Sequence, residues 1–138
     1  MENYAVTVIH LNAQTERAIT IEADEAETTD DIILNTQIDG VFLSASSHGY
    51  FSAFQKLRDK LLQKGYGVKC VGSKLNAVQS PMASATYKVY EVILGEQATL
   101  KNLVCLFNYA DIGEFPNTTK QNDFFEMWLR SLEKNMKL

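Results

Sequence analysis

The feature that most constrains the fold is a helical repeat of apolar residues in two separate stretches. The first repeat is formed by Phe51, Phe54, Leu57, Leu61 and Leu62. The second is formed by Phe124, Phe125, Trp128, Leu129 and Leu132. A spacing of three and four residues places these side chains on one face of a helix. The sequence therefore predicts two amphipathic helices, each with one face to bury.

The flanking residues predict where these helices start and stop. Ser46 or Ser47 is placed to cap the first helix, and Gly65 supplies its left-handed exit. Thr118 and Gln121 match a capping box at the start of the second helix.

Outside these helices the chain favours short strands in which apolar and polar residues mostly alternate. The predicted strands are Tyr4–Leu11, Ala18–Glu22, Ile38–Ala45, Tyr66–Val71, Tyr87–Leu94 and Leu100–Tyr109. The first two are expected to pair as an antiparallel hairpin through Asn12–Arg17, and Asp30–Asn35 to form one helical turn. Alternation is typical of an antiparallel sheet with one covered face.

We predict an α+β fold for a single globular domain spanning residues 1–138. In detail, we expect a two-layer sandwich. It has a mainly antiparallel sheet of about six strands with two helices on one face, in the order β-β-β-α-β-β-β-α.

Charge is unevenly distributed along this acidic chain, which has 17 acids, 13 bases and a net charge of −4. Between Arg17 and Lys56 there is no lysine or arginine. Such a segment is either a solvated loop or a surface that binds a basic partner. The candidate partner-binding residues are Glu22, Asp24, Glu25, Glu27, Asp30 and Asp31.

A second candidate site is the stretch Gly72–Thr86, which has no clear periodicity and contains Pro81. Loops of this length in a compact domain are usually functional or disordered. Its polar side chains Lys74, Gln79 and Ser80 are the candidate ligand contacts.

Catalytic and metal-binding motifs do not emerge from the sequence. The segment Ser44–Gly49 holds serines and a histidine but lacks the G-x-S-x-G pattern that exposes a nucleophile. Cys70 and Cys105 stand in apolar strand contexts, where burial raises a thiol pKa. The acidic segment lacks the glycine and ligand spacing of a calcium loop, and no close ligand pair suits zinc. We therefore expect no catalytic residue, no metal, no cofactor and no enzymatic activity.

Nucleic acid and membranes are not the expected partners. Lys56, Arg58, Lys60 and Lys64 are predicted to lie mainly on the solvated side of the first helix, and the net charge is negative. The longest apolar run is five residues, whereas a membrane span needs about 20.

The expected compartment is the cytoplasm. The N-terminus shows no secretory signal, and two cysteines suit a reducing environment.

Several segments carry a resemblance of layout: Gly40–Ser46 (GVFLSAS), Val68–Gly72 (VKCVG), Ser80-Pro81-Met82, Leu103–Phe107 and Phe124–Leu132. In this order they resemble a group of small uncharacterised bacterial cytoplasmic proteins. Small size, acidity and the lack of a catalytic set are also similar to the immunity proteins that neutralise polymorphic or contact-dependent toxins. The likeness is one of type, and it assigns no functional residue.

Our leading hypothesis is a non-enzymatic binding protein, an immunity protein that masks a basic toxin domain by stoichiometric binding. One alternative is a small-molecule binding protein or enzyme that uses the 72–86 loop. Another is a structural or assembly subunit. The sequence indicates no oligomeric state.

Overall fold

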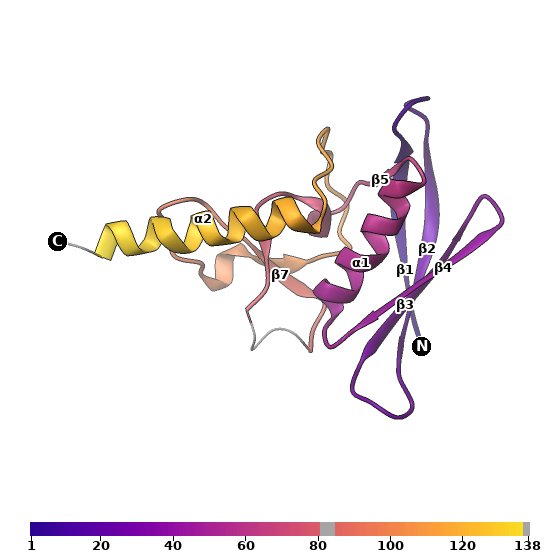
Figure 1. The fold of residues 1–138 in the computed structure, drawn as a ribbon, viewed down its shortest axis with the longest axis horizontal. Coiled ribbons are helices and arrows are strands. Elements are labelled where there is room, and N and C mark those ends of the chain that lie inside the picture. The colour runs from indigo at the N-terminus through magenta and orange to yellow at the C-terminus, as the bar shows by residue number, and fades with distance from the viewer. Residues whose placement is uncertain (81–84, 137–138) are drawn as a thin grey trace.

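The first half of the chain forms a five-stranded antiparallel sheet (Figure 1). The computed structural model describes residues 1–80 and 85–136. The strands are β1 (Glu2–His10), β2 (Glu16–Glu25), β3 (Ile32–Ile38), β4 (Val41–Ser47) and β5 (Tyr66–Val68). Their spatial order is β4-β3-β2-β1-β5, so the first four strands form a meander and β5 returns to pair with β1.

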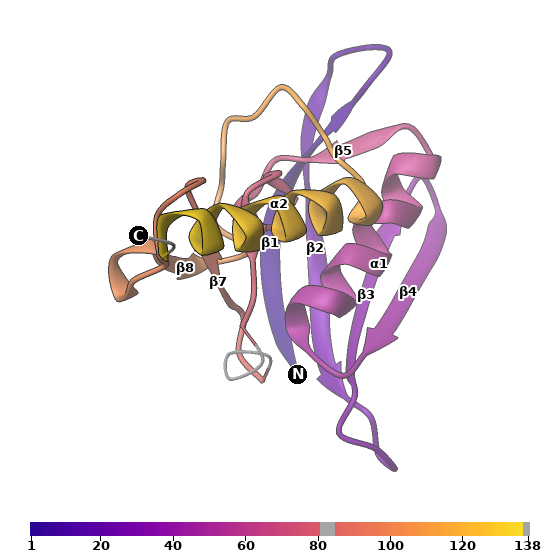
Figure 2. The same ribbon diagram turned by 60° about the vertical axis from the view of Figure 1, so that its left-hand side comes forward.

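One face of this sheet is apolar and the other is polar. On β2, Ile19, Ile21 and Ala23 are buried, whereas Thr20 and Glu22 between them are exposed. Strand residues point alternately to the two faces, so this alternation assigns the buried set to one side. The helix α1 (Tyr50–Gln63) packs against that side (Figure 2).

The apolar repeat of α1 forms the predicted buried stripe. Phe54, Leu57 and Leu61 are fully buried against the sheet. Gly65 follows with φ of +90°, a conformation that favours glycine, and so ends the helix as predicted. The predicted serine cap is wrong, because β4 continues to Ser47, which pairs with Ile32 and leaves Gly49 as the N-cap.

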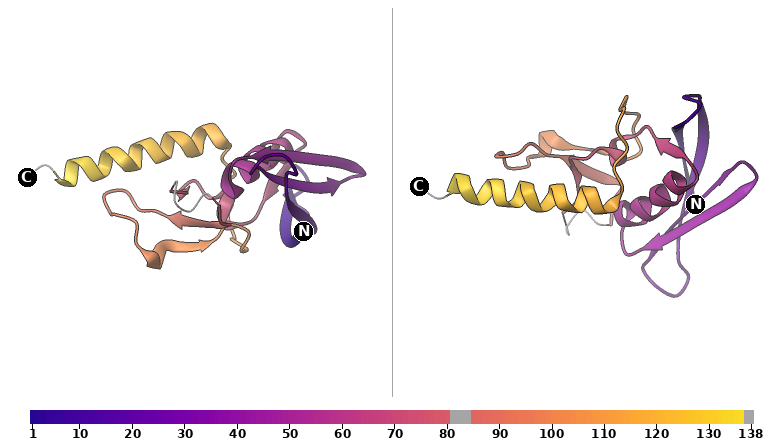
Figure 3. Two further views of the ribbon diagram at one scale, coloured as in Figure 1. Left: turned by 90° about the horizontal axis from the view of Figure 1, so that it is seen from below. Right: turned by 45° about the horizontal axis from the view of Figure 1, so that its top comes forward.

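The second half of the chain builds a smaller layer beside the first. It contains β6 (Ala77–Val78), β7 (Lys88–Glu91) and β8 (Leu103–Cys105) in one sheet, and the helix α2 (Thr118–Met136). Two short 3-10 turns, η1 (Val71–Ser73) and η3 (Leu100–Asn102), lie between these elements. The helix α2 extends away from the five-stranded sheet, with the three-stranded sheet alongside it (Figure 3).

A small second core joins α2 to this layer. It contains Val78, Val92 and Trp128, with Phe124 and Leu132 packed against them. The indole nitrogen of Trp128 donates a hydrogen bond to the carbonyl of Glu96 at 2.9 Å. Three residues of the apolar repeat predicted for the second helix thus pack against β6 and the segment after β7, whereas Phe125 and Leu129 of that repeat are exposed.

The predicted α+β class, the two helices and the first hairpin are confirmed. The helical turn predicted at Asp30–Asn35 is wrong, since β3 occupies this stretch with Ile32, Leu34 and Thr36 buried in alternation. The strands predicted at Tyr66–Val71 and Leu100–Tyr109 are shorter than expected. The first stretch runs into η1 at Val71 and the second begins with η3, and an isolated bridge joins Cys70 to Tyr109.

The predicted loop Gly72–Thr86 is partly ordered secondary structure. Residues 71–73 form η1, and β6 pairs with β7 through Ala77 and Val78. Pro81 and its neighbours to residue 84 lie outside the described residues.

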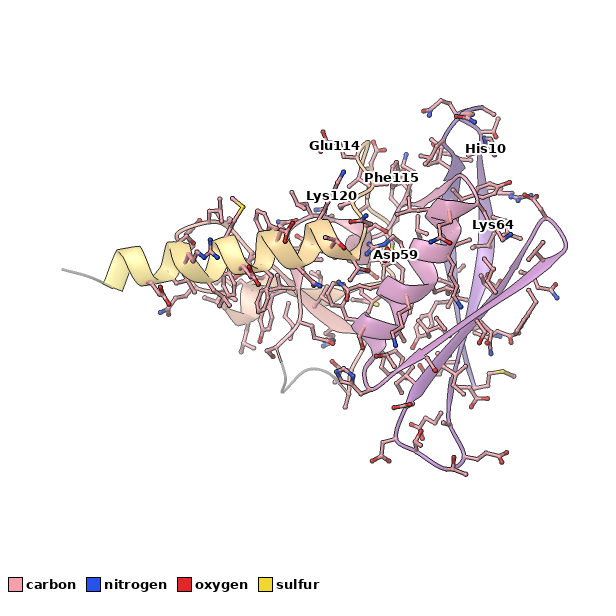
Figure 4. All side chains as sticks on the ribbon, in the orientation of Figure 1. His10, Asp59, Lys64, Glu114, Phe115 and Lys120 are labelled. Carbon is pink, nitrogen blue, oxygen red and sulfur yellow. The ribbon has the colours of Figure 1, made fainter. Side chains whose placement is uncertain are left out.

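A close approach at β5 requires glycine. A Cβ atom at Gly67 would lie 2.5 Å from the ring of Phe115. Phe115 belongs to the segment that leads into α2 (Figure 4), so this contact ties the second half of the chain to the sheet.

Candidate functional site

The acids predicted to bind a partner gather at one end of the five-stranded sheet. They occupy the end of β2, the turn to β3 and the residue just before β3, at the bottom of Figure 1. Glu2 joins them, because it lies opposite Ala23 in the pairing of β1 with β2. We call this group the acidic end, and it consists of Glu2, Glu22, Asp24, Glu25, Glu27, Asp30 and Asp31.

The acidic end presents its carboxylates in more than one direction. Glu22 and Asp24 are exposed on the face of the sheet opposite α1. Glu25 falls on the other side of the alternation along β2, so it belongs to the face that α1 covers. Glu27 and Asp30 belong to the turn, which closes with a hydrogen bond from the amide of Ala26 to the carbonyl of Asp31. Both faces of the sheet therefore meet negative charge at this end.

Among the residues whose side chains the structure describes (1–80 and 85–133), no carboxylate of the acidic end forms an ion pair. The carboxylates that do so are Glu16, Asp39, Asp59, Glu91, Asp111 and Glu126. The negative charge of the acidic end is thus not neutralised by nearby lysine or arginine. Uncompensated charge of one sign steers an oppositely charged partner toward the surface that carries it.

Three tyrosines border the acidic end. The ring of Tyr87 lies 6.0 Å from that of Tyr4 and 6.3 Å from that of Tyr50. The hydroxyl of Tyr4 donates a hydrogen bond to Glu2. Burial and the charges of Glu2 and Glu25 raise the pKa of Tyr50. The three tyrosines therefore add aromatic surface beside the charge.

The opposite end of the same sheet has its charges paired. Arg17 contacts Asp39 at 2.6 Å, and the hydroxyl of Tyr66 donates to the other oxygen of Asp39. The ammonium of Lys69 lies 2.8 Å from Asp111 and 3.3 Å from Glu16. We call these six residues the paired end.

The candidate nucleophiles are poorly placed for catalysis. Burial raises the pKa of the Cys70 thiol to about 11, so it is a weak nucleophile at neutral pH. Cys70 and Cys105 are both free thiols. Ser47 Oγ lies 3.4 Å from His48 Nδ1, and Ser47 is buried.

The described part of the chain contains no group of three metal-ligating side chains. No helix in that part is long and apolar enough to cross a membrane.

A buried polar cluster joins α1 to the start of α2. Gln121 Oε1 accepts hydrogen bonds from Arg58 at 2.7 Å and from Gln55 at 3.0 Å. Gln121 Nε2 donates to the carbonyls of Gly72 and Lys74. Arg58 was expected on the solvated side of its helix, and this is wrong because it is fully buried in this cluster.

The cluster also replaces the predicted capping box of α2. The side chain of Gln121 is buried and does not cap the helix. Instead Asn117 Oδ1 accepts from the amide of Lys120, and Asp59 on α1 accepts from the amide of Thr118 (Figure 4). The start of α2 is therefore fixed by a carboxylate from the neighbouring helix.

A cleft of about 330 Å³ lies between α1, β6 and α2. We call it the neutral cleft, since its described lining holds no lysine, arginine, aspartate or glutamate. It is lined by His48, Phe51, Ser52, Gln55, Ala77, Val78, Gln79, Ser80, Gln121, Asn122 and Phe125.

The structure separates the three predicted ligand contacts. Gln79 and Ser80 line the neutral cleft, where Gln79 donates to the carbonyls of Thr86 and Lys88. Lys74 lies elsewhere, with its ammonium 3.2 Å from Glu91.

Sequence reasoning missed Gln55 and Gln121 in the cleft, and Glu2 at the acidic end. Gln55 stands four positions after Phe51, on the apolar face of α1, and this was a readable signal. No such signal marked Glu2, because only the pairing of β1 with β2 brings it to the acidic segment.

Comparison with known proteins finds no match, either among models of protein families or among curated sequences.

Proposed function

We propose that this protein is a non-enzymatic binding protein of the immunity type, which neutralises a basic toxin domain by covering it in a one-to-one complex. The observation that carries the proposal is the acidic end, whose carboxylates have no ion-pair partner among the described residues. Acids in this state attract a basic surface without first breaking an internal ion pair.

The tyrosines beside the acidic end support the same function. Tyr87 is 37% exposed, and Tyr4 and Tyr50 are partly exposed. Tyrosine is enriched among the residues that dominate binding energy, and aromatic faces also attract arginine and lysine. A basic partner would thus find both charge and contact area at this end.

We further propose that the protein acts in the cytoplasm of a bacterial cell. Two free cysteines, one of them buried, suit a reducing compartment. Binding there would cover the substrate-binding surface of the toxin domain before it acts.

The test is affinity purification of the tagged full chain from its own cells, with mass spectrometry of the retained proteins. The expected result is one basic protein in a one-to-one complex, toxic when produced alone and harmless when produced with this chain. Co-production of the retained protein without any protection would contradict the proposal.

A further inference from the structure

We propose that the neutral cleft binds a flat, uncharged heterocycle that carries a ring N–H group, a molecule of nucleobase type. This inference is independent of the acidic end. It rests on the orientation of one amide, on the walls of the cleft and on the charge of its lining.

The neighbours of Gln121 fix the orientation of its side-chain amide. Its Nε2 lies 2.8 Å from the carbonyl oxygen of Gly72 and 2.7 Å from that of Lys74. Carbonyl oxygens only accept hydrogen bonds, so the atom facing them is the nitrogen. Its Oε1 lies 2.7 Å from Arg58 Nη2, which only donates. Gln121 therefore presents an acceptor to Gln55.

This arrangement determines which side-chain atom of Gln55 has no partner in the cluster. Gln55 turns its Nε2 toward Gln121 Oε1 at 3.0 Å, so its own Oε1 points elsewhere. Gln55 is only 8% exposed and lines the cleft, and no described residue donates to its Oε1. This oxygen is not fully enclosed, since Arg58 Nη1 is the one fully buried side-chain atom without a partner among the described residues. It therefore reaches solvent and can accept a hydrogen bond from a ligand. The matching group on a ligand is an N–H donor.

Aromatic walls favour a flat ligand. Phe51 is buried in the core and borders the cleft from α1, whereas Phe125 borders it from α2 and is 36% exposed. Ring faces of this kind bind planar molecules through stacking or edge contacts. Ser80 and Asn122 add neutral hydrogen-bonding groups to the lining.

Charge and size narrow the class of ligand. Among the described lining residues only His48 can carry a charge, so a phosphate would find no lysine or arginine. The volume of about 330 Å³ is near the lower end of ligand pockets, which run from about 300 to 1,000 Å³. The cleft therefore suits a single ring system and not a nucleotide.

The test is titration of the isotope-labelled full chain with uracil, cytosine, adenine and hypoxanthine, one at a time, followed by NMR. The expected result is saturable shifts for at least one base. These shifts should be confined to the side-chain amides of Gln55 and Asn122 and to the backbone of residues 77–80 and 121–125. No saturable shift at these positions with any of the four bases would overturn the proposal.

A change in the ligand tests the N–H group without altering the protein. We expect 1,3-dimethyluracil, which has no ring N–H, to bind about tenfold more weakly than uracil if uracil is the base that binds, or a ring-N-methylated form of whichever base does. Equal affinity of the methylated and unmethylated bases would contradict the role of Gln55 Oε1.

A matched pair of variants tests the residue itself. Gln55→Met keeps the length of the side chain and removes the acceptor together with the amide that donates to Gln121. Gln63→Met makes the same change at an exposed position of the same helix. We expect Gln55→Met to weaken base binding about tenfold and Gln63→Met to leave it unchanged. If Gln55→Met does not fold, Phe125→Ala at the half-exposed wall should still weaken binding several-fold, and unchanged affinity there would contradict the cleft as the site.

Discussion

Both ends of the five-stranded sheet carry charged side chains, but these are paired with opposite charges at one end and unpaired at the other. At the paired end, Asp39 contacts Arg17 and Tyr66, and Lys69 contacts Asp111 and Glu16. At the acidic end, the carboxylates have no ion-pair partner among the described side chains of residues 1–80 and 85–133. The same sheet thus neutralises charge where strands β1, β2 and β5 are joined, and leaves it free at the opposite end. Charges of the first kind serve the fold, and we propose that those of the second kind serve binding.

We expect the largest loss of stability from a substitution in the buried polar cluster between α1 and α2. Gln121→Leu removes the partner of buried Arg58 and Gln55 and of two backbone carbonyls. We expect the free energy of unfolding to fall by about 3 kcal/mol, because buried polar groups are left unsatisfied. Urea unfolding measures the change, with Asn122→Leu at the next, exposed position as the control. A loss no larger than that of the control would mean that the cluster does not hold α2 in place.

Acidification should weaken the paired end. Hydrogen bonds from Tyr66 and Arg17 lower the pKa of Asp39, and a hydrogen bond from Lys69 lowers that of Asp111. A carboxyl group whose pKa is lowered by folding contributes stability above its unfolded pKa of about 3.9 and loses it as the pH falls through the lower, folded value. The urea midpoint should therefore fall as the pH drops below about 4.

The double variant Asp39→Asn, Asp111→Asn identifies the groups responsible for this pH dependence. It should be less stable at neutral pH and show a shallower decrease in acid. An acid dependence identical to that of the unmodified protein would show that other carboxyls cause it.

A single charge-removing substitution at each end should show that the two ends differ in their contribution to stability. Asp39 has φ of +52°, a conformation that asparagine also tolerates, so Asp39→Asn removes the charge and leaves the turn intact. We expect a decrease of a few degrees at most in the melting temperature, since exposed ion pairs contribute little. Asp30→Asn in the other turn should cause no decrease. Equal losses at both positions would remove the distinction between the two ends.

The smallest expected effect is a slight gain in stability when acids of the acidic end are neutralised. Combining Glu25→Gln, Glu27→Gln, Asp30→Asn and Asp31→Asn relieves repulsion between neighbouring acids, so the urea midpoint should stay constant or rise slightly at low salt. The rise should disappear as salt screens the charges. A clear loss of stability would show that these acids support the fold.

Local patterns predicted much of this fold, since each depends on residues close in sequence. The stripe from Phe51 to Leu61 predicted α1 because it is both long and regular. The β-branched residues of β1 and β2 predicted the first hairpin. By contrast, Asp30–Asn35 was mistaken for a helical turn, because the acids before β3 obscured the alternation of Ile32, Leu34 and Thr36.

The candidate sites were less predictable because they depend on contacts between distant segments. The acids at the β2–β3 turn are contiguous, so the sequence could propose them as a group. That they lack ion pairs depends on where every lysine and arginine lies, and Arg58 was placed on the wrong side of its helix. The neutral cleft joins Gln55 to Gln121, 66 residues apart. No local pattern indicates such a pairing.

The most direct test of the central claim compares two variants with the same net charge in binding to the protein retained in the affinity purification. One neutralises Glu25, Glu27, Asp30 and Asp31. The other neutralises Glu96, Glu114, Asp123 and Glu133, which are exposed but lie outside the acidic end. We predict that the first variant binds at least about tenfold more weakly at low salt and loses most of its salt dependence, whereas the second binds as the unmodified protein does. Equal affinity of the two variants would contradict the assignment of the acidic end to partner binding.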